Sequence, residues 1–395
     1  MKFSFSKWSS MLAMTLLATV GHAADCSTDC REPPRQVPQK PKPKPMPKPD
    51  DCCVPCWFHH GCSQEYGFYL TADFLWWRTE NHGYSFAFDQ QDSLANIGKV
   101  QRINPKWDPG FRVGLGWNSD YDGWDVLFNW TWMYNHAKTT RIRNDLTVAE
   151  ITTQGYYPQW PITSTLLQNS TNLPLLASGH FNFRQVDAKS NIHLNAIDFE
   201  LGRSFYATRR FSLRPHWGVR GAFIDQKFSN VFSDPLINPV ALARLLGTQP
   251  AFAFDGKNNW WGVGPRAGMF SEWHLCSGFS ILGKAAGALM YGQTRVSSVT
   301  QTVPFLTDTY VVIRKASEHF DQLVPNLQMM LGLQWGTCFN CDSMYFGMNV
   351  CWETNYWWNQ FNLPASVDLF DAPLPSIGNQ PLTQEGLTIN LELDF

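Results

Sequence analysis

The strongest constraint on this chain is an alternation of apolar and polar residues that recurs in short segments. In residues 111–117, apolar side chains occupy every second position and alternate with Arg112 and two glycines. Successive side chains of a β-strand point to opposite faces, so the pattern predicts a strand with one apolar and one polar face. Ten strands are predicted in this way, and the other nine lie at residues 67–77, 124–134, 192–201, 211–220, 261–269, 279–291, 323–335, 344–353 and 387–395.

One of these segments changes phase. Ile192 and Leu194 fit one register, whereas Ile197, Phe199 and Leu201 fit the other. A β-bulge inserts one extra residue and would reconcile the two registers, so we predict a bulge near Ala196 and Ile197.

The strands are best explained by a transmembrane antiparallel up-and-down β-barrel. The chain contains 18 Trp, 28 Phe and 12 Tyr, and only 16% of its residues are charged. Aromatic residues favour the lipid headgroup boundary, and a closed sheet pairs every backbone group that hydrocarbon would leave unsatisfied. After residue 23 the sequence contains no apolar run of about 18–20 residues, which is the length that a membrane-spanning helix needs. A soluble β-sandwich or barrel, with the apolar face as its core, is the alternative.

The connections between predicted strands fall into two classes. Short ones lie near Asn118, Tyr206, Cys276 and Gly336, and long ones occur between them. Outer-membrane barrels have short periplasmic turns and long external loops, so both ends of the barrel are expected on the periplasmic side. The expected count is about ten strands, or twelve if a long loop hides a hairpin.

The N-terminal part differs from the rest. Lys2 and Lys7 precede an apolar run, and Gly21-His22-Ala23 resembles a signal peptidase site, so residues 1–23 are expected to be a signal peptide. Residues 24–64 contain Lys-Pro repeats and are expected to form an extended, largely disordered periplasmic arm, followed by the barrel at 65–395. The net charge of −2 argues against a nucleic-acid partner.

Cysteines cluster in the arm and at predicted periplasmic turns. Export places them in an oxidising compartment, which favours disulfides within the protein or to other envelope proteins. The candidates are Cys26, Cys30, Cys52, Cys53, Cys56, Cys62, Cys276, Cys338 and Cys341, and the sequence leaves their connectivity open. Zinc binding by the cysteines and histidines of residues 52–62 is the alternative, but that segment lacks two paired C-x-x-C units. We expect no metal and no cofactor.

Charged residues at inward positions are the candidate pore lining. They are Arg112, Asp125, Asp198, Glu200, Arg214, His216, Arg220, Arg266, Glu272 and Glu353. They predict either a constriction with facing charged rows, which sorts ions by sign, or a structural network of ion pairs that fills the interior. Histidines near the loops show no nucleophile–base spacing, so an enzyme is not expected.

The last strand ends in an aromatic residue, Phe395, and resembles the signal that barrel assembly machinery recognises. Several segments together resemble the Legionella major outer membrane protein-like, pore-forming family, which also has members in chlamydia-related bacteria. They are Gly67–Trp77, Trp107–Gly116, Asp122–Asp125, Ile197–Arg203, Leu213–Gly221 and Trp261–Gly268, with the C-terminal strand. The Lys-Pro and cysteine-rich arm departs from this family's pattern.

The resemblance implies a bacterial outer-membrane porin that passes ions or small hydrophilic solutes. The alternative function is a structural or adhesive barrel with a plugged lumen, surface loops that bind host or neighbouring surfaces, and a disulfide-linked periplasmic arm. Expected partners are outer-membrane lipid and the assembly machinery, and homo-oligomerisation remains open.

Overall fold

The computed structural model describes residues 67–81, 83–92, 97–144, 154–158, 183–208, 210–235, 252–276, 278–302, 311–339, 344–362 and 380–395. The chain divides into two units, 1–51 and 52–395, and every described residue belongs to the second. The expected signal peptide and arm therefore lie outside the described residues. No helix among the described residues is long and apolar enough to cross a membrane.

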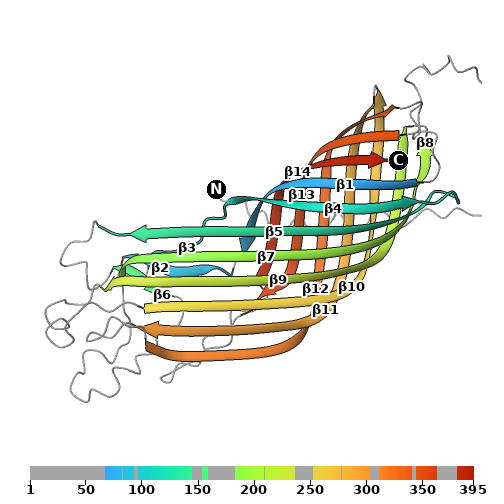
Figure 1. Cartoon of the computed structure of the whole chain (residues 1–395). Helices are drawn as coiled ribbons and strands as arrows, with labels where there is room; N and C mark the ends of the chain where they lie inside the picture. Colours follow the sequence, from blue (N-terminus) through green and yellow to red (C-terminus); the bar gives the residue numbers. More distant parts are fainter. Residues whose placement is uncertain are drawn as a thin grey trace, which may run out of the picture. The chain divides into compact units, whose positions relative to one another are not determined.

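Ten antiparallel strands close into a barrel, as the alternation predicts (Figure 1). Around the wall they are β1 (Gly67–Asn81), β4 (Trp107–Asn118), β5 (Trp124–Ile142), β7 (Phe183–Arg203), β9 (Phe211–Pro235), β10 (Phe252–Cys276), β11 (Phe279–Thr302), β12 (Val311–Phe339), β13 (Met344–Phe361) and β14 (Gln380–Asp394). Closure is made by the first and last strands, with Phe74 opposite Ile389. The barrel therefore leaves no edge within its wall, as a sheet in lipid requires.

Four short strands stand outside this wall. They are β2 (Ser85–Asp92), β3 (Ile97–Arg102), β6 (Gly155–Pro158) and β8 (Phe205–Thr208). The first long loop does contain a hairpin, β2–β3, but β2 pairs with β6 instead of entering the wall. The barrel wall therefore has ten strands and not twelve among the described residues.

The short connections confirm the predicted alternation of turns and loops. Between β4 and β5, Asp122 and Gly123 both have positive φ, of 56° and 69°, and Ser119 N–H donates to the Trp124 carbonyl at 2.8 Å. Two successive left-handed residues match the twist of adjoining strands, which explains an Asp-Gly pair there. A Cβ on Gly123 would lie 2.6 Å from the Ser204 carbonyl, so this turn also packs against its neighbour.

An apolar band surrounds the outside of the barrel. On β9 to β12 it covers residues 211–223, 261–273, 279–291 and 323–335, where every second side chain faces outward. Roughly a dozen residues rising about 3.3 Å each, at a tilt near 40°, span about 30 Å, which matches a hydrocarbon core. Aromatic residues mark the two rims of the band, with Phe223, Trp261 and Tyr291 at one and Trp273, Phe279 and Trp335 at the other. This exposed band excludes the soluble alternative.

Beyond the outer rim of the band, the apolar face changes sides. On β9, Ile224 and Phe228 point inward and are buried, whereas Asp225 and Lys227 point outward and are exposed. The wall therefore continues past the lipid into the external medium, where water lies outside and an apolar core lies inside.

The same reversal explains the phase change on β7, and the predicted bulge there is wrong. Pairing with β5 and β9 runs without a register shift through Ala196 and Ile197. Ile197 is 39% exposed on the lipid side, whereas Ile192 is 2% exposed inside the external part of the barrel. The strand remains regular, and the surroundings of its outward face change from lipid to water along its length.

Candidate functional site

Ion pairs fill the barrel interior at the level of the lipid band. Glu353 on β13 is fully buried, and one of its carboxylate oxygens lies 2.7 Å from a guanidinium nitrogen of Arg112 on β4. Arg112 also lies 2.9 Å from Asp73 on β1. Because β1 and β14 separate β4 from β13 in the wall, the Arg112–Glu353 pair reaches across part of the lumen.

A second group of ion pairs surrounds Glu200 on β7. Its carboxylate lies 3.0 Å from Arg266, 3.4 Å from Lys284 and 3.6 Å from Arg214. The buried ring of His216 adds a contact at 3.7 Å from Glu200. Four positively charged or titratable side chains from β9, β10 and β11 therefore converge on one buried carboxylate.

Asp198 and Asp125 complete the network. Arg220 donates from two guanidinium nitrogens to the two oxygens of Asp198, at 2.6 and 2.7 Å, a bidentate pair. Arg220 also donates to Asn326 on β12, and Arg214 makes an ion pair with Asp125. The predicted ion-pair network is thus present, and its side chains link strands that are not neighbours in the wall, such as β9 and β12.

Glu272 alone among the ten predicted interior residues lies apart from these pairs. It sits near the periplasmic end of β10, 3.4 Å from His274. The other nine lie on inward positions and contact one another directly or through shared partners. Whether they line a conducting pore stays a prediction.

Three important interior residues were not selected from the sequence. Asp73 alternates with outward apolar residues in β1, and this position could have identified it. Lys284 lies in the small-residue segment whose alternation is weak. Gln328 donates to Glu353 at 2.5 Å and accepts from Arg220 at 3.1 Å, and nothing in its local sequence distinguishes it from an ordinary inward amide.

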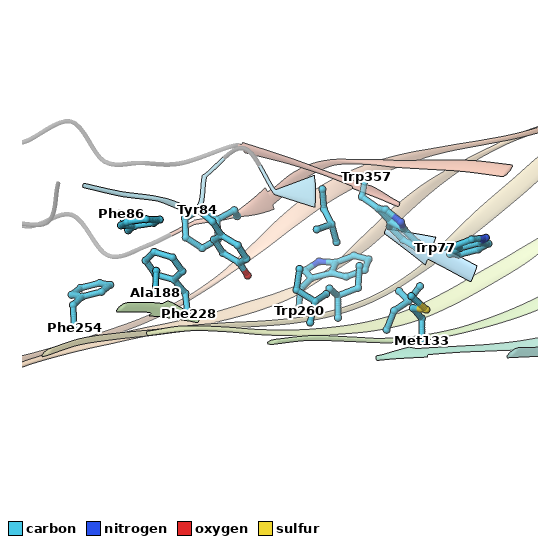
Figure 2. Close-up of a cluster of buried hydrophobic side chains, with 14 of the residues drawn as sticks. Trp77, Tyr84, Phe86, Met133, Ala188, Phe228, Phe254, Trp260 and Trp357 are labelled. Atoms are coloured by element: carbon cyan, nitrogen blue, oxygen red, sulfur yellow. The ribbon is translucent and has the colours of Figure 1, made fainter. Parts of the chain in front are cut away.

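An apolar cluster fills the interior beyond the ion pairs (Figure 2). Trp260 on β10 and Trp357 on β13 meet edge to face with ring centroids 6.4 Å apart, although β11 and β12 lie between these strands in the wall. Both indoles are at most 2% exposed, so bulk water does not reach them. The cluster continues outward through Phe228 and Phe254.

Two segments that leave the wall complete this apolar cluster. Tyr84, which precedes β2, stacks on Phe228 at 5.0 Å and meets Phe361 edge to face at 4.9 Å. The backbone carbonyl of Gln360 at the end of β13 accepts from Gln226 at 2.8 Å and from Asn258 at 2.6 Å. Wall and connecting segments together form a plug, defined here as Trp260, Trp357, Tyr84, Phe228 and Phe361.

The cysteine and C-terminal predictions fall partly outside the described residues. Of the nine disulfide candidates, only Cys276 and Cys338 lie in described strands. Cys338 is disulfide-bonded, and the identity of its partner and the pairing of the other candidates stay predictions. Cys351, which was not a candidate, is free and buried. The Phe395 amide donates to the Phe68 carbonyl at 3.0 Å, so the terminal residue takes part in barrel closure. Among the described residues, no group of His, Cys, Asp or Glu is arranged to hold a metal.

A family model described as the Legionella pneumophila major outer membrane protein precursor matches residues 62–395. The chain belongs to this family. The predicted family resemblance is therefore confirmed, and the protein is a β-barrel of the bacterial outer membrane. No curated protein matches the chain.

Solved structures show only distant similarity. The outer membrane protease OmpT from Escherichia coli is 7% identical, with 83% of this chain and 97% of that chain covered and a TM-score of 0.38. The P. putida toluene transporter TodX is 10% identical, with coverages of 83% and 90% and a TM-score of 0.27. A major outer membrane protein from Thermus thermophilus is 11% identical, with coverages of 84% and 100% and a TM-score of 0.27.

Proposed function

We propose that the protein is a porin for ions or small hydrophilic solutes, and that its plug is closed in this structure. The observation that supports this is the charged interior at the level of the lipid. Buried ion pairs contribute little net stability compared with packed apolar residues, so a purely structural barrel has little use for so many. Ionisable groups at membrane depth commonly mark the path of an ion or polar solute.

The charges also suggest the kind of solute. Five cations and five carboxylates share the network, namely Arg112, Arg214, Arg220, Arg266 and Lys284 with Asp73, Asp125, Asp198, Glu200 and Glu353. A balanced lining favours neither sign of ion strongly. We therefore expect weak ion selectivity in the open state, and no catalytic step is part of the proposal.

Trp260, Trp357 and Phe228 lie on wall strands, so the part of the plug that must move is Tyr84 with the segment around Gln360. It is held by aromatic contacts and by a few hydrogen bonds from Gln226 and Asn258 to the Gln360 carbonyl, whereas the wall is held by continuous ladders. Local unfolding occurs most readily in the parts of a structure that are held by few contacts and hydrogen bonds. Displacement of the segments around Tyr84 and Gln360 would open the external half without breaking the wall.

Single-channel recording in a planar bilayer with a salt gradient tests this proposal. We expect brief steps from the native protein and a larger open fraction from Trp357→Ala, which removes one side of the contact across the lumen. Trp358→Ala is the matched control, because the neighbouring indole is 38% exposed and faces outward. Glu200→Gln is expected to move the reversal potential toward anion preference.

A structural or adhesive barrel is the second candidate, and the buried plug is the observation that favours it. Folded, inserted protein that never conducts, either as the native chain or as Trp357→Ala, would exclude the porin and leave this candidate. Equal opening by Trp357→Ala and Trp358→Ala would remove the assigned role of the plug.

A further inference from the structure

The outward face just beyond the lipid band holds lysines in an unfavourable arrangement. Lys227 on β9 and Lys257 on β10 are directly opposite in register, and both are exposed. Lys138 on β5 and Lys189 on β7 repeat the arrangement one strand pair away. Directly opposed side chains lie about 5 Å apart, and like charges at that spacing destabilise a sheet.

Nearby carboxylates compensate for only part of this charge. Lys138 has Asp187 at 4.0 Å. Among the residues that the structure describes, neither Lys227 nor Lys257 has an ion-pair partner within 4.0 Å, although Asp225 and Asp255 lie on the same outward face. Arg295 on β11 adds a further exposed cation opposite Asn259, so cations exceed carboxylates on this face.

One row across four neighbouring strand pairs contains no carboxylate at all. This basic row consists of His136, Asn191, Lys227, Lys257 and Ser297, each opposite the next in register. All of its side chains can donate hydrogen bonds, and two are permanent cations at neutral pH. Such a row fits an anion with several acceptor oxygens.

The position of the row indicates which anion. Lys227 lies four residues beyond Phe223, and Lys257 lies four residues before Trp261, the aromatic residues of the outer rim. The row thus follows the hydrocarbon band on the same outward face, at the height where lipid headgroups lie. Short periplasmic turns at the opposite end place this rim in the outer leaflet.

We propose that the basic row binds the phosphorylated headgroup of an outer-leaflet glycolipid. The lipid's acyl chains pack on the apolar band below, and its phosphate lies between Lys227 and Lys257. The bound anion turns the repulsion between the two ammonium groups into two attractive contacts. Basic residues at a membrane surface gain roughly 1 kcal/mol each from anionic lipid, which is about fivefold in affinity for each lysine.

The test uses the full chain folded in a neutral detergent and bisphosphorylated lipid A as the probe. Lys227→Gln/Lys257→Gln is expected to weaken lipid A binding by about 25-fold, about fivefold for each lysine. Lys99→Gln/Arg210→Gln is the matched control, because it removes two exposed charges from outside the row and is expected to bind like the native protein. Dephosphorylated lipid A with the same acyl chains is expected to bind both proteins weakly and equally.

A second measurement separates binding from folding. Without lipid, the Lys227→Gln/Lys257→Gln protein is expected to be at least as heat-stable as the native one, because the opposed charges are gone. Lys227→Arg/Lys257→Arg is expected to retain native affinity. Equal lipid A affinity for the native and Gln proteins, or equal affinity for the phosphorylated and dephosphorylated lipids, would overturn the proposal.

Discussion

Glu353 provides a direct test of how the charged interior is stabilised. Its carboxylate accepts hydrogen bonds from Arg112 at 2.7 Å, Gln328 at 2.5 Å, Thr388 at 3.0 Å and Asn355 at 3.1 Å, and its side chain is 0% exposed. Glu353→Gln retains the shape but removes the charge and turns an amide N–H₂ toward existing donors. Removing one partner of a buried ion pair is costly, and here Arg112 keeps only Asp73 as a carboxylate partner. The expected loss in unfolding free energy is about 3 kcal/mol, at the low end for a buried pair.

The matched control is Glu385→Gln on β14. Glu385 makes an ion pair with Arg78, but the two side chains are 26% and 41% exposed. Exposed pairs are screened by water, so the expected loss is below about 1 kcal/mol. Both variants carry the same chemical change, and they differ mainly in burial.

The assay is urea unfolding of protein folded in phospholipid vesicles, followed by tryptophan fluorescence. We expect the midpoint for Glu353→Gln to fall well below that of Glu385→Gln. Adding Arg112→Gln to Glu353→Gln is expected to cost less than the sum of the single changes, because the first change has already broken the Arg112–Glu353 pair, although Asp73 then loses its cation. Equal losses of unfolding free energy for Glu353→Gln and Glu385→Gln would refute the inference that burial makes an ion pair costly to break.

Three further predictions concern assembly and the turns. Phe395→Ser is expected to lower the folded fraction in outer membranes several-fold, as measured by the heat-dependent shift of the band on a gel, whereas the nearby outward change Leu391→Ser serves as a position control. Gly278 has a φ of 79° and a Cβ there would clash with the Gly336 carbonyl, so Gly278→Val is expected to lower stability by roughly 2 kcal/mol or more in the urea assay. High-mass bands on a non-reducing gel of isolated membranes are expected to disappear on adding thiol, and an unchanged monomer would exclude disulfide cross-links between proteins.

The sequence predicts the wall of the barrel well because lipid and lumen impose opposite requirements on successive residues. On β9 and β10, Arg214, Arg220 and Arg266 lie at the inward positions that alternation predicts. The turns were found because they are short, and Asp122-Gly123 has the composition that such a turn needs.

The external part of the barrel was predicted less well. Alternation says which residues share a face, but it does not say whether water lies inside or outside that face. Alternation therefore predicts a bulge near Ala196, whereas Ile192 belongs to an inward apolar core in a regular strand. The plug could not be predicted either, because Trp260 and Trp357 meet only through the closure of the sheet.

The reversal of the apolar face also fixes how deep the protein sits in the membrane. Phe223 and Trp261 mark the last outward positions suited to hydrocarbon, and Asp225 and Lys227 follow at once. A shift of the barrel inward by one pair of residues would submerge charged side chains, and a shift outward would expose the aromatic rim to water. Lys or Arg on the lipid face costs up to about 2–4 kcal/mol as it approaches the midplane. These two costs together hold the barrel at one depth along the membrane normal.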